Sequence, residues 1–110
     1  MTCVKFFADK NGIYGFEVSG HSSVNCDDET GKIVCSAVSS AVYMAANTVT
    51  DIIGDTAVCE VDDAKMFFSA PKLSDSSRKV LEGLRLHLTE LSGQYSNNIK
   101  IYGGAKNVKD

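Results

Sequence analysis

The chain has 110 residues, a net charge of −3 and a pI near 5.3, and 44% of its residues are hydrophobic. This length predicts one domain with a single core, and this composition is that of a globular protein rather than a disordered chain. The acidic balance and the absence of a long basic cluster argue against a polyanion-binding domain. We therefore expect no direct nucleic-acid binding.

The lack of a recognisable signal peptide and the spacing of the cysteines indicate a cytoplasmic protein. The N-terminal segment lacks the basic-then-apolar layout of a signal peptide, and no apolar run approaches the ~20 residues needed to cross a bilayer. The four cysteines, Cys3, Cys26, Cys35 and Cys59, are widely spaced and form no CxxC pair. Without an export signal they are expected to be thiols. We predict a cytoplasmic protein that does not associate with membranes.

Two β-rich segments begin the chain and predict a hairpin. Residues 2–8 are rich in β-forming side chains, and an Asn11-Gly12 turn separates them from residues 13–19. Apolar side chains occupy alternate positions of the second segment: Tyr14, Phe16 and Val18. This period of two predicts one buried face.

A long polar segment and an apolar helix are expected next. Residues 20–32 show no period and predict a loop, of a length that often carries function. From residue 33 to 53, apolar side chains recur with helical spacing, which predicts a helix packed across the sheet. Thr30 is the expected N-cap of this helix, and Gly54 is its expected end.

The second half of the chain repeats a hairpin followed by a helix. Residues 57–61 and 65–69 predict the hairpin, and a helix capped by Ser74 or Asp75 is expected to reach about Gln94. One side of this helix is apolar: Val80, Leu84, Leu88, Leu91 and Tyr95.

A short last strand, residues 99–102, completes the order ββαββαβ. This order predicts an α+β fold in which a mostly antiparallel sheet is covered by two helices. We expect residues 1–102 to form a single domain and residues 103–110 to be a polar tail. The pattern predicts a fold class and leaves the function open.

The candidate chemistry lies in His21 and Cys35. His21 follows Gly20 where a strand ends, and Cys35 is expected in the first turn of a helix, so packing of these elements can bring the two together. Free N–H groups at a helix start stabilise a thiolate and an oxyanion, and an imidazole accepts the thiol proton. The pair predicts a nucleophilic Cys35 with His21 as its base. The alternative is a core cysteine, the commoner role in an apolar helix.

These residues resemble the ribosomal-processing cysteine proteases, the Prp family of bacteria. The resemblance covers nearly the whole chain, and its motif comprises Gly20-His21, the polar loop, Ile33-Val34-Cys35, Ala37, Ser39 and Asn47. It implies a homodimeric endopeptidase that removes the N-terminal extension of a large-subunit ribosomal protein precursor. It also implies that Cys35 is the nucleophile and His21 the general base. This chemistry needs no metal and no organic cofactor.

Gly20, Ser36 and Ser39 are the expected substrate-binding or supporting residues. Ser39 lies one helical turn beyond Cys35 on the same face, where its hydroxyl can bond the sulfur or a substrate carbonyl. The family's cleavage sequence has paired phenylalanines followed by alanine. The resemblance therefore implies an aromatic-accepting pocket beside Cys35, with the loop 22–32 closing over the peptide.

Two positions depart from the family's usual pattern. Lys32 stands where an aspartate is usual, three residues before the cysteine, and Ser36 stands where an alanine is usual. Asp27 or Asp28 would then substitute for the missing aspartate, or the activity would be weaker. Lys32 can instead help to stabilise the thiolate, because a nearby cation lowers the pKa of a thiol.

Two further hypotheses concern the cysteines. A Cys26–Cys35 disulfide would switch activity off under oxidation. Zinc bound by His21, Cys26, Asp27 and Cys35 is the metal alternative, although this spacing matches no zinc motif. Cys3 and Cys59 fall on predicted strands and are expected in the core.

Two hypotheses remain about the function. The segment Phe6-Phe7-Ala8 resembles the family's cleavage sequence and suggests self-cleavage, although a buried strand explains it more simply. The main alternative to an enzyme is a non-catalytic dimeric module that holds a peptide or a ribosome component in the same groove.

Overall fold

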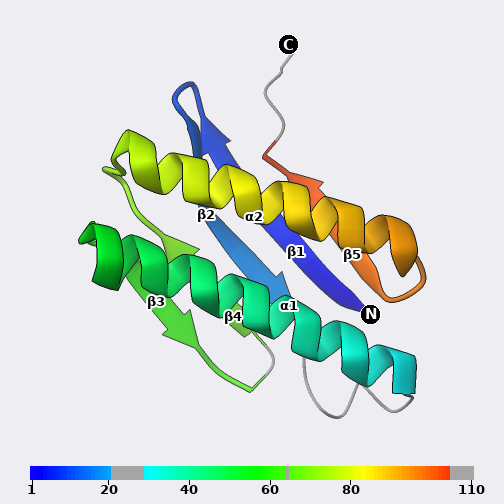
Figure 1. The fold of residues 1–110 in the computed structure, drawn as a ribbon. Helices are drawn as coiled ribbons and strands as arrows, with labels where there is room; N and C mark the ends of the chain where they lie inside the picture. The colour runs from blue at the N-terminus through cyan, green and yellow to red at the C-terminus, as the bar shows by residue number, and fades with distance from the viewer. Residues whose placement is uncertain (21–28, 64, 105–110) are drawn as a thin grey trace.

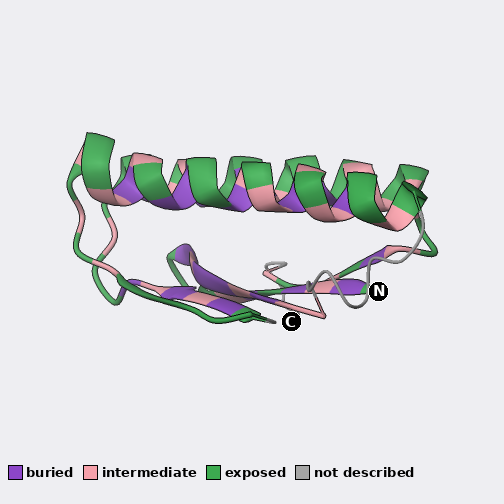
Figure 2. Cartoon of the chain, turned by 90° about the horizontal axis from the view of Figure 1, so that it is seen from below, coloured by how far each residue is buried: buried purple, intermediate pink, exposed green. Residues whose placement is uncertain are grey.

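The computed structural model describes residues 1–20, 29–63 and 65–104. These residues form two layers, a five-stranded sheet and a layer of helices that covers one face of it (Figure 1). Seen edge-on, the helices lie side by side above the sheet (Figure 2). The predicted α+β class is confirmed.

The elements follow the predicted order ββαββαβ. The strands are β1 (Thr2–Asp9), β2 (Gly12–Ser19), β3 (Val58–Val61), β4 (Lys65–Ser69) and β5 (Ile99–Gly103). The helices are α1 (Glu29–Asn47), its π-helical continuation η2 (Thr48–Ile53), and α2 (Asp75–Gln94).

Two boundaries differ from the sequence prediction. Helix α1 already includes Glu29, so Thr30 lies inside the helix and is not its N-cap, and residues 29–32 are helical rather than part of a loop. Strand β5 extends to Gly103, one residue into the predicted tail. Both boundaries lie in polar segments, where no apolar period marks the end of an element.

The sheet has the order β3-β4-β2-β1-β5 and is antiparallel except at one pair. Strand β5 runs parallel to β1, and Thr2 lies opposite Ile99. In the β1–β2 hairpin the register shifts after Phe7, which leaves Tyr14 as an extra, half-buried residue. The ring of Tyr14 packs against the ring of Phe7 at 6.0 Å between centroids.

The core lies between the sheet and the helices, and buried positions follow the helix sides that face the sheet (Figure 2). At its centre the rings of Phe16 and Phe68 stack at 5.2 Å between centroids. Burial of each such side chain stabilises the fold by about 1.5–3 kcal/mol. The helices contribute these fully buried side chains: Val34, Val38, Val49, Leu81 and Leu88.

The ends of the helices confirm two local predictions. The Ser74 side chain accepts a hydrogen bond from the Ser77 N–H at 3.3 Å, which makes Ser74 the N-cap of α2. Gly54 has a φ of 94° and closes η2 in the left-handed region that favours glycine.

Residues 29–53 have the length and the mean hydropathy, 1.4, of a membrane-crossing helix, by length and composition alone. This finding differs from the prediction that no apolar run is long enough to cross a bilayer. The core helix of a soluble protein passes the same test, and α1 packs Val34, Val38 and Val42 against the sheet. We therefore interpret this segment as a core helix.

Candidate active site

The start of the chain and the first half of α1 meet at one end of the molecule. The Thr2 Oγ1 atom lies 3.8 Å from the Cys35 Sγ atom. Figure 1 shows the N-terminus at the end of the molecule where α1 begins. Since Cys3 pairs with Ser19 across the hairpin, the end of β2 lies at this end as well. The predicted meeting of a strand end and the Cys35 helix is therefore present in the described residues.

Gly20 fixes the path of the chain as it leaves β2. Its φ is +70°, and a Cβ atom there would lie 2.3 Å from the Met1 carbonyl oxygen. Only glycine fits both conditions. The backbone at Gly20 thus lies against Met1, which directly precedes the Thr2 in contact with Cys35. His21 follows Gly20 but lies outside the described residues, so its distance from Cys35 stays a prediction.

Cys35 lies deeper in its helix than the sequence predicted. Helix α1 includes Glu29, which places Cys35 beyond the first turn. In a regular helix, N–H groups at this depth bond to carbonyls four residues earlier, and the dipole effect has fallen off. The expectation that free helix-start N–H groups surround Cys35 is therefore wrong. Stabilisation of its thiolate must come from other groups.

The Cys35 sulfur is half-buried and is part of a disulfide in this structure. Cys26, which the sequence analysis paired with it, lies outside the described residues. The thiolate is the nucleophilic form of cysteine, so any protease chemistry at Cys35 requires that this bond be reduced.

Thr2 is a site residue that the sequence analysis missed. Only 2% of its surface is exposed, and its N–H donates to the Asn98 carbonyl at 2.9 Å. Pairing between β1 and β5 therefore holds Thr2 in place beside the sulfur. A hydroxyl at this position can donate a hydrogen bond to a thiolate and so favour the charged form. The only signal in the sequence is a polar residue at the start of a strand rich in β-forming side chains.

The predicted supporting serines differ in their surroundings. Ser39 is half-buried one turn beyond Cys35 and lines a small pocket with Val18 and Tyr43. Ser36 is exposed, and Lys32 is exposed in the first turns of α1. Of the serines, Ser39 is therefore the better placed to contact a peptide held at Cys35.

A larger hollow of about 710 Å³ runs between α1 and α2. Ala37, Ser40 and Met44 line it from one helix, and Gly83 and His87 line it from the other. Neither Cys35 nor Ser39 contributes to its lining. This hollow is therefore separate from the candidate active site.

The remaining cysteine and metal predictions have mixed outcomes. Cys3 is half-buried, but Cys59 is exposed on β3, so its predicted core position is wrong. Partial burial of the Cys59 sulfur nevertheless raises the pKa of its thiol. The zinc hypothesis rests mainly on His21, Cys26 and Asp27, which lie outside the described residues.

The family model for cysteine protease Prp matches residues 1–100, and the chain belongs to this family of cysteine proteases. No curated protein matches the chain.

Solved structures from two bacteria share this fold. SMU.848 from Streptococcus mutans is 19% identical, with a TM-score of 0.83 over 93% of this chain and 96% of that chain. The ribosomal processing protease Prp from S. aureus in complex with a substrate peptide is 16% identical, with a TM-score of 0.84 over 94% of this chain and 100% of that chain. The same protease with a covalently linked product peptide is 18% identical, with a TM-score of 0.80 over the same shares. At these identities the likeness shows a common fold.

Proposed function

We propose that this protein is a cysteine endopeptidase that removes the N-terminal extension of a large-subunit ribosomal protein during ribosome maturation. Membership of the Prp family supports the reaction class. The observation that carries the proposal is the contact of 3.8 Å between Thr2 Oγ1 and Cys35 Sγ, at the end of the molecule where β2 leads towards His21. The substrate is proposed from the family and from the relative solved with a substrate peptide.

The proposed reaction is acyl transfer through Cys35. His21 accepts the thiol proton, and the sulfur attacks the scissile carbonyl carbon to give a tetrahedral oxyanion. The intermediate collapses as His21 returns the proton to the leaving amine, which departs with the C-terminal product. Water, deprotonated by His21, then attacks the thioester and releases the carboxylate product and the free thiol. No metal or organic cofactor takes part.

The protein is proposed to act in the cytoplasm as a homodimer. No charged side chain occurs from Ile33 to Thr50, although this stretch includes exposed positions. Met44 is 63% exposed and Ile52 79%, which is typical of a surface that a partner covers. Light scattering on the purified protein tests this proposal, and a monomer at high micromolar concentration would contradict it.

The second candidate function is a non-catalytic dimeric module that binds a peptide or a ribosome component. The position of Cys35 beyond the first turn of α1 favours it, because the thiolate lacks the stabilisation of a helix start. The rate of Cys35 alkylation against pH, in a variant carrying Cys3→Ser, Cys26→Ser and Cys59→Ser, separates the two functions. A thiol that titrates well below about 8.5 indicates the enzyme, and an ordinary titration indicates the binding module.

The direct test is cleavage of a peptide that spans the extension of the ribosomal protein, incubated with reduced protein and analysed by mass spectrometry. Cys35→Ala and His21→Ala should each lower kcat/KM by about a thousandfold or more. Cys59→Ser is the matched control and should cut at the wild-type rate, because Cys59 is exposed on β3. An uncut peptide with reduced wild-type protein would contradict the proposal.

A further inference from the structure

A pocket of about 120 Å³ lies beside α1, on the side of the helix that carries Cys35. Strand β2, helix α1 and the β3–β4 hairpin contribute its lining: Val18, Ser39, Val42, Tyr43, Val61, Asp62, Asp63, Lys65 and Met66. Ser39 belongs both to this lining and to the face of Cys35, one helical turn earlier. A peptide held at the Cys35 sulfur and running along α1 therefore passes this pocket.

The floor of the pocket is apolar. Val18, Val42 and Met66 are all buried, and Val18 lies opposite Met66 in the β2–β4 pairing. Tyr43 forms part of the wall and is 44% exposed, so one side of its ring is open to a bound group. This lining suits an unbranched chain of methylene groups.

The rim of the pocket is acidic. Asp62 and Asp63 are exposed in the turn between β3 and β4, and Asp62 Oδ1 accepts a hydrogen bond from the Lys65 N–H at 2.9 Å. The Lys65 ammonium pairs with the Glu17 carboxylate at 3.8 Å. Side chains alternate along β2, so Glu17 lies on the opposite face of the sheet from Val18. The carboxylate of Glu17 thus offsets the charge of Lys65, and the two aspartates leave the rim with a net negative charge.

We propose that this pocket accepts a lysine or arginine side chain of the peptide substrate. The aliphatic stem lies on Val18, Val42 and Met66, and the cationic end reaches Asp62 and Asp63. The open ring of Tyr43 adds a cation–π contact. This inference rests on the proposed function and names one feature of its substrate.

The distance from Cys35 places the basic residue near the cut. Ser39 and Tyr43 lie about 6 and 12 Å beyond Cys35 along the helix axis, at 1.5 Å per residue. An extended peptide advances about 3.3 Å per residue. The lysine or arginine is therefore expected two to four residues from the scissile bond.

The test uses peptides that carry Lys, Met or Glu at each position within four residues of the cut. We expect one position at which wild-type kcat/KM is about fivefold higher for Lys than for Met, because two exposed ion pairs contribute about 1 kcal/mol together. Glu should be the poorest residue there. The preference should shrink between low and high salt, since exposed charges are screened.

The variant Asp62→Asn plus Asp63→Asn should lose the preference for Lys over Met. Asparagine retains the side-chain oxygen that accepts the Lys65 N–H, so the turn is expected to stay intact. Glu82→Gln plus Glu90→Gln is the matched control, because it makes the same change in charge at exposed positions of α2. This control should retain the preference.

Two results would overturn the inference: equal rates for Lys, Met and Glu at every position, or a preference that survives in the Asp62→Asn, Asp63→Asn variant. If the proposed function itself is wrong, the result differs from both of these, because no peptide is cut at all. In that case, binding of the Lys and Met peptides to Cys35→Ala, measured by fluorescence anisotropy, still decides the question. The Lys peptide should bind about fivefold more tightly, and equal affinity would reject the pocket assignment.

Discussion

The two ends of the molecule are held together by different interactions. At the end with Cys35, the described contacts are steric or weakly polar, apart from the disulfide that Cys35 forms. The Gly20 backbone lies directly against Met1, and the Thr2 hydroxyl reaches the sulfur at 3.8 Å. None of these groups carries a side-chain charge.

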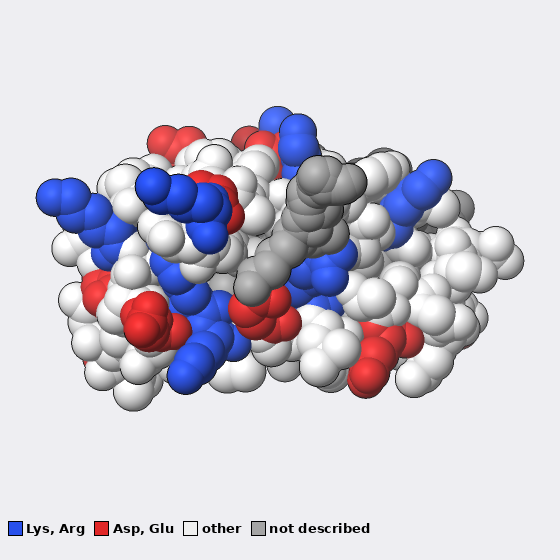
Figure 3. Space-filling view, turned by 90° about the horizontal axis from the view of Figure 1, so that it is seen from above, with Lys and Arg blue, Asp and Glu red and all other residues white. Residues whose placement is uncertain are grey.

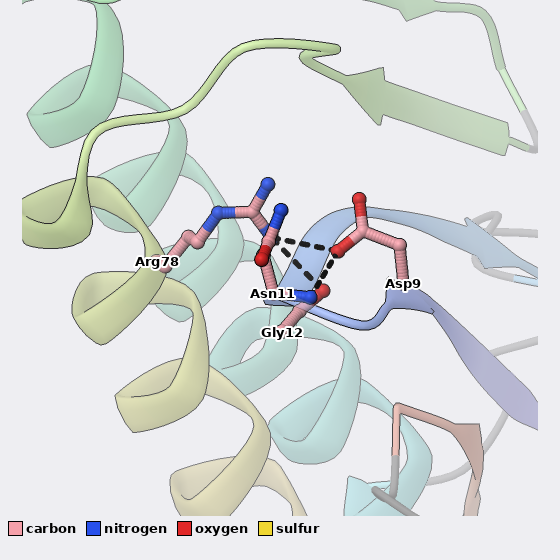
Figure 4. A network of polar contacts seen from close by, with 4 residues as sticks. All are labelled: Asp9, Asn11, Gly12 and Arg78. Atoms are coloured by element: carbon pink, nitrogen blue, oxygen red, sulfur yellow. Dashed lines mark hydrogen bonds and ion pairs between the residues drawn. The ribbon is translucent and has the colours of Figure 1, made fainter.

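The opposite end is held by charged side chains. The Arg78 guanidinium donates to the Gly12 carbonyl at 3.0 Å and to Asp9 Oδ1 at 3.2 Å, and Asp9 Oδ1 also accepts the Asn11 N–H at 2.8 Å (Figure 4). The Asn11 N–H has the largest effect on the Asp9 carboxyl and lowers its pKa; desolvation opposes this, and the Arg78 charge lowers the pKa further. On the face seen in Figure 3, basic and acidic side chains lie close together.

This difference suggests a division of roles. The charged network closes the β1–β2 turn onto α2 and contributes to stability, whereas the contacts at the other end position the proposed nucleophile, Cys35. Substitutions at the cysteine end should therefore change activity more than stability, and substitutions at the far end should do the reverse. The following four experiments test this division, from the largest expected effect to the smallest.

Gly20→Ala should have the largest effect. A Cβ atom there would lie 2.3 Å from the Met1 carbonyl oxygen, at a φ of +70°. We expect a loss of about 1–3 kcal/mol of stability, because the backbone must shift. That shift moves the segment leading to His21, so kcat/KM should fall by about tenfold or more.

Gly93→Ala is the control for this experiment, because nothing lies within 4 Å of a Cβ at that position in α2. It should keep full activity and gain up to about 1 kcal/mol of stability in urea unfolding. A folded Gly20→Ala protein with wild-type kcat/KM would show that Gly20 does not position the site.

Thr2→Val removes a hydroxyl and keeps the shape of the side chain. We expect kcat/KM to fall about three- to tenfold, since a hydrogen bond to a charged group contributes about 1.5–3 kcal/mol at most. The pKa of the Cys35 thiol, followed by alkylation against pH, should rise. Thr2→Ser should restore both quantities. An unchanged thiol titration in Thr2→Val would remove Thr2 from the site.

Arg78→Met should lower stability and spare activity. The Arg78 side chain is only 11% exposed, and its loss leaves the Gly12 carbonyl without this donor. We expect urea unfolding to show a loss of about 1–2 kcal/mol. Lys79→Met, at the exposed neighbouring position, should change stability by less than about 0.5 kcal/mol. A large fall in kcat/KM for Arg78→Met would contradict the division of roles.

The Asp55→Asn substitution should have the smallest effect, a change in stability that is measurable only at acidic pH. The pKa of its carboxyl is lowered, first by the nearby Ser77 hydroxyl and then by the Ser74 amide and hydroxyl. Ser77 Oγ is buried without a hydrogen-bond partner among the described residues, so we attribute the effect mainly to the two bonds from Ser74, at 2.9 and 2.8 Å.

A depressed pKa means that the ionised carboxylate favours the folded state. Its contribution is fully present above about pH 4, the ordinary range for aspartate, and is lost as pH falls through the lower folded-state pKa. The stability of the wild type should therefore decline more steeply between pH 4 and pH 2 than that of Asp55→Asn. Parallel curves from thermal melts across this range would reject the interaction.

Local signals in the sequence predicted most of the fold. Ser74 or Asp75 was predicted as a cap, and Ser74 is the cap, while Gly54 was predicted as a helix end, because each residue type has a specific role at a helix terminus. The start of α1 was missed, since residues 29–32 are polar and extend the helix without an apolar period. The π-helical turn η2 was also missed, because its apolar spacing resembles that of the α-helix before it.

The candidate site was predictable only in part. The approach of the Cys35 helix to the end of β2 follows from the order of the elements. The role of Thr2 does not, because it depends on the parallel pairing of β1 with β5 from the other end of the sequence. Cys59 was misplaced for a similar reason, since the sequence does not indicate which strand lies at the edge of the sheet.

The pairing of the first strand with the last also has a consequence for biosynthesis. Thr2 leaves the ribosome early, but its N–H bonds to the Asn98 carbonyl, which is among the last backbone groups of the fold to emerge. Contacts between segments so distant in sequence form late. The surroundings of Cys35 are thus completed only after the segment at Asn98 has joined the first strand.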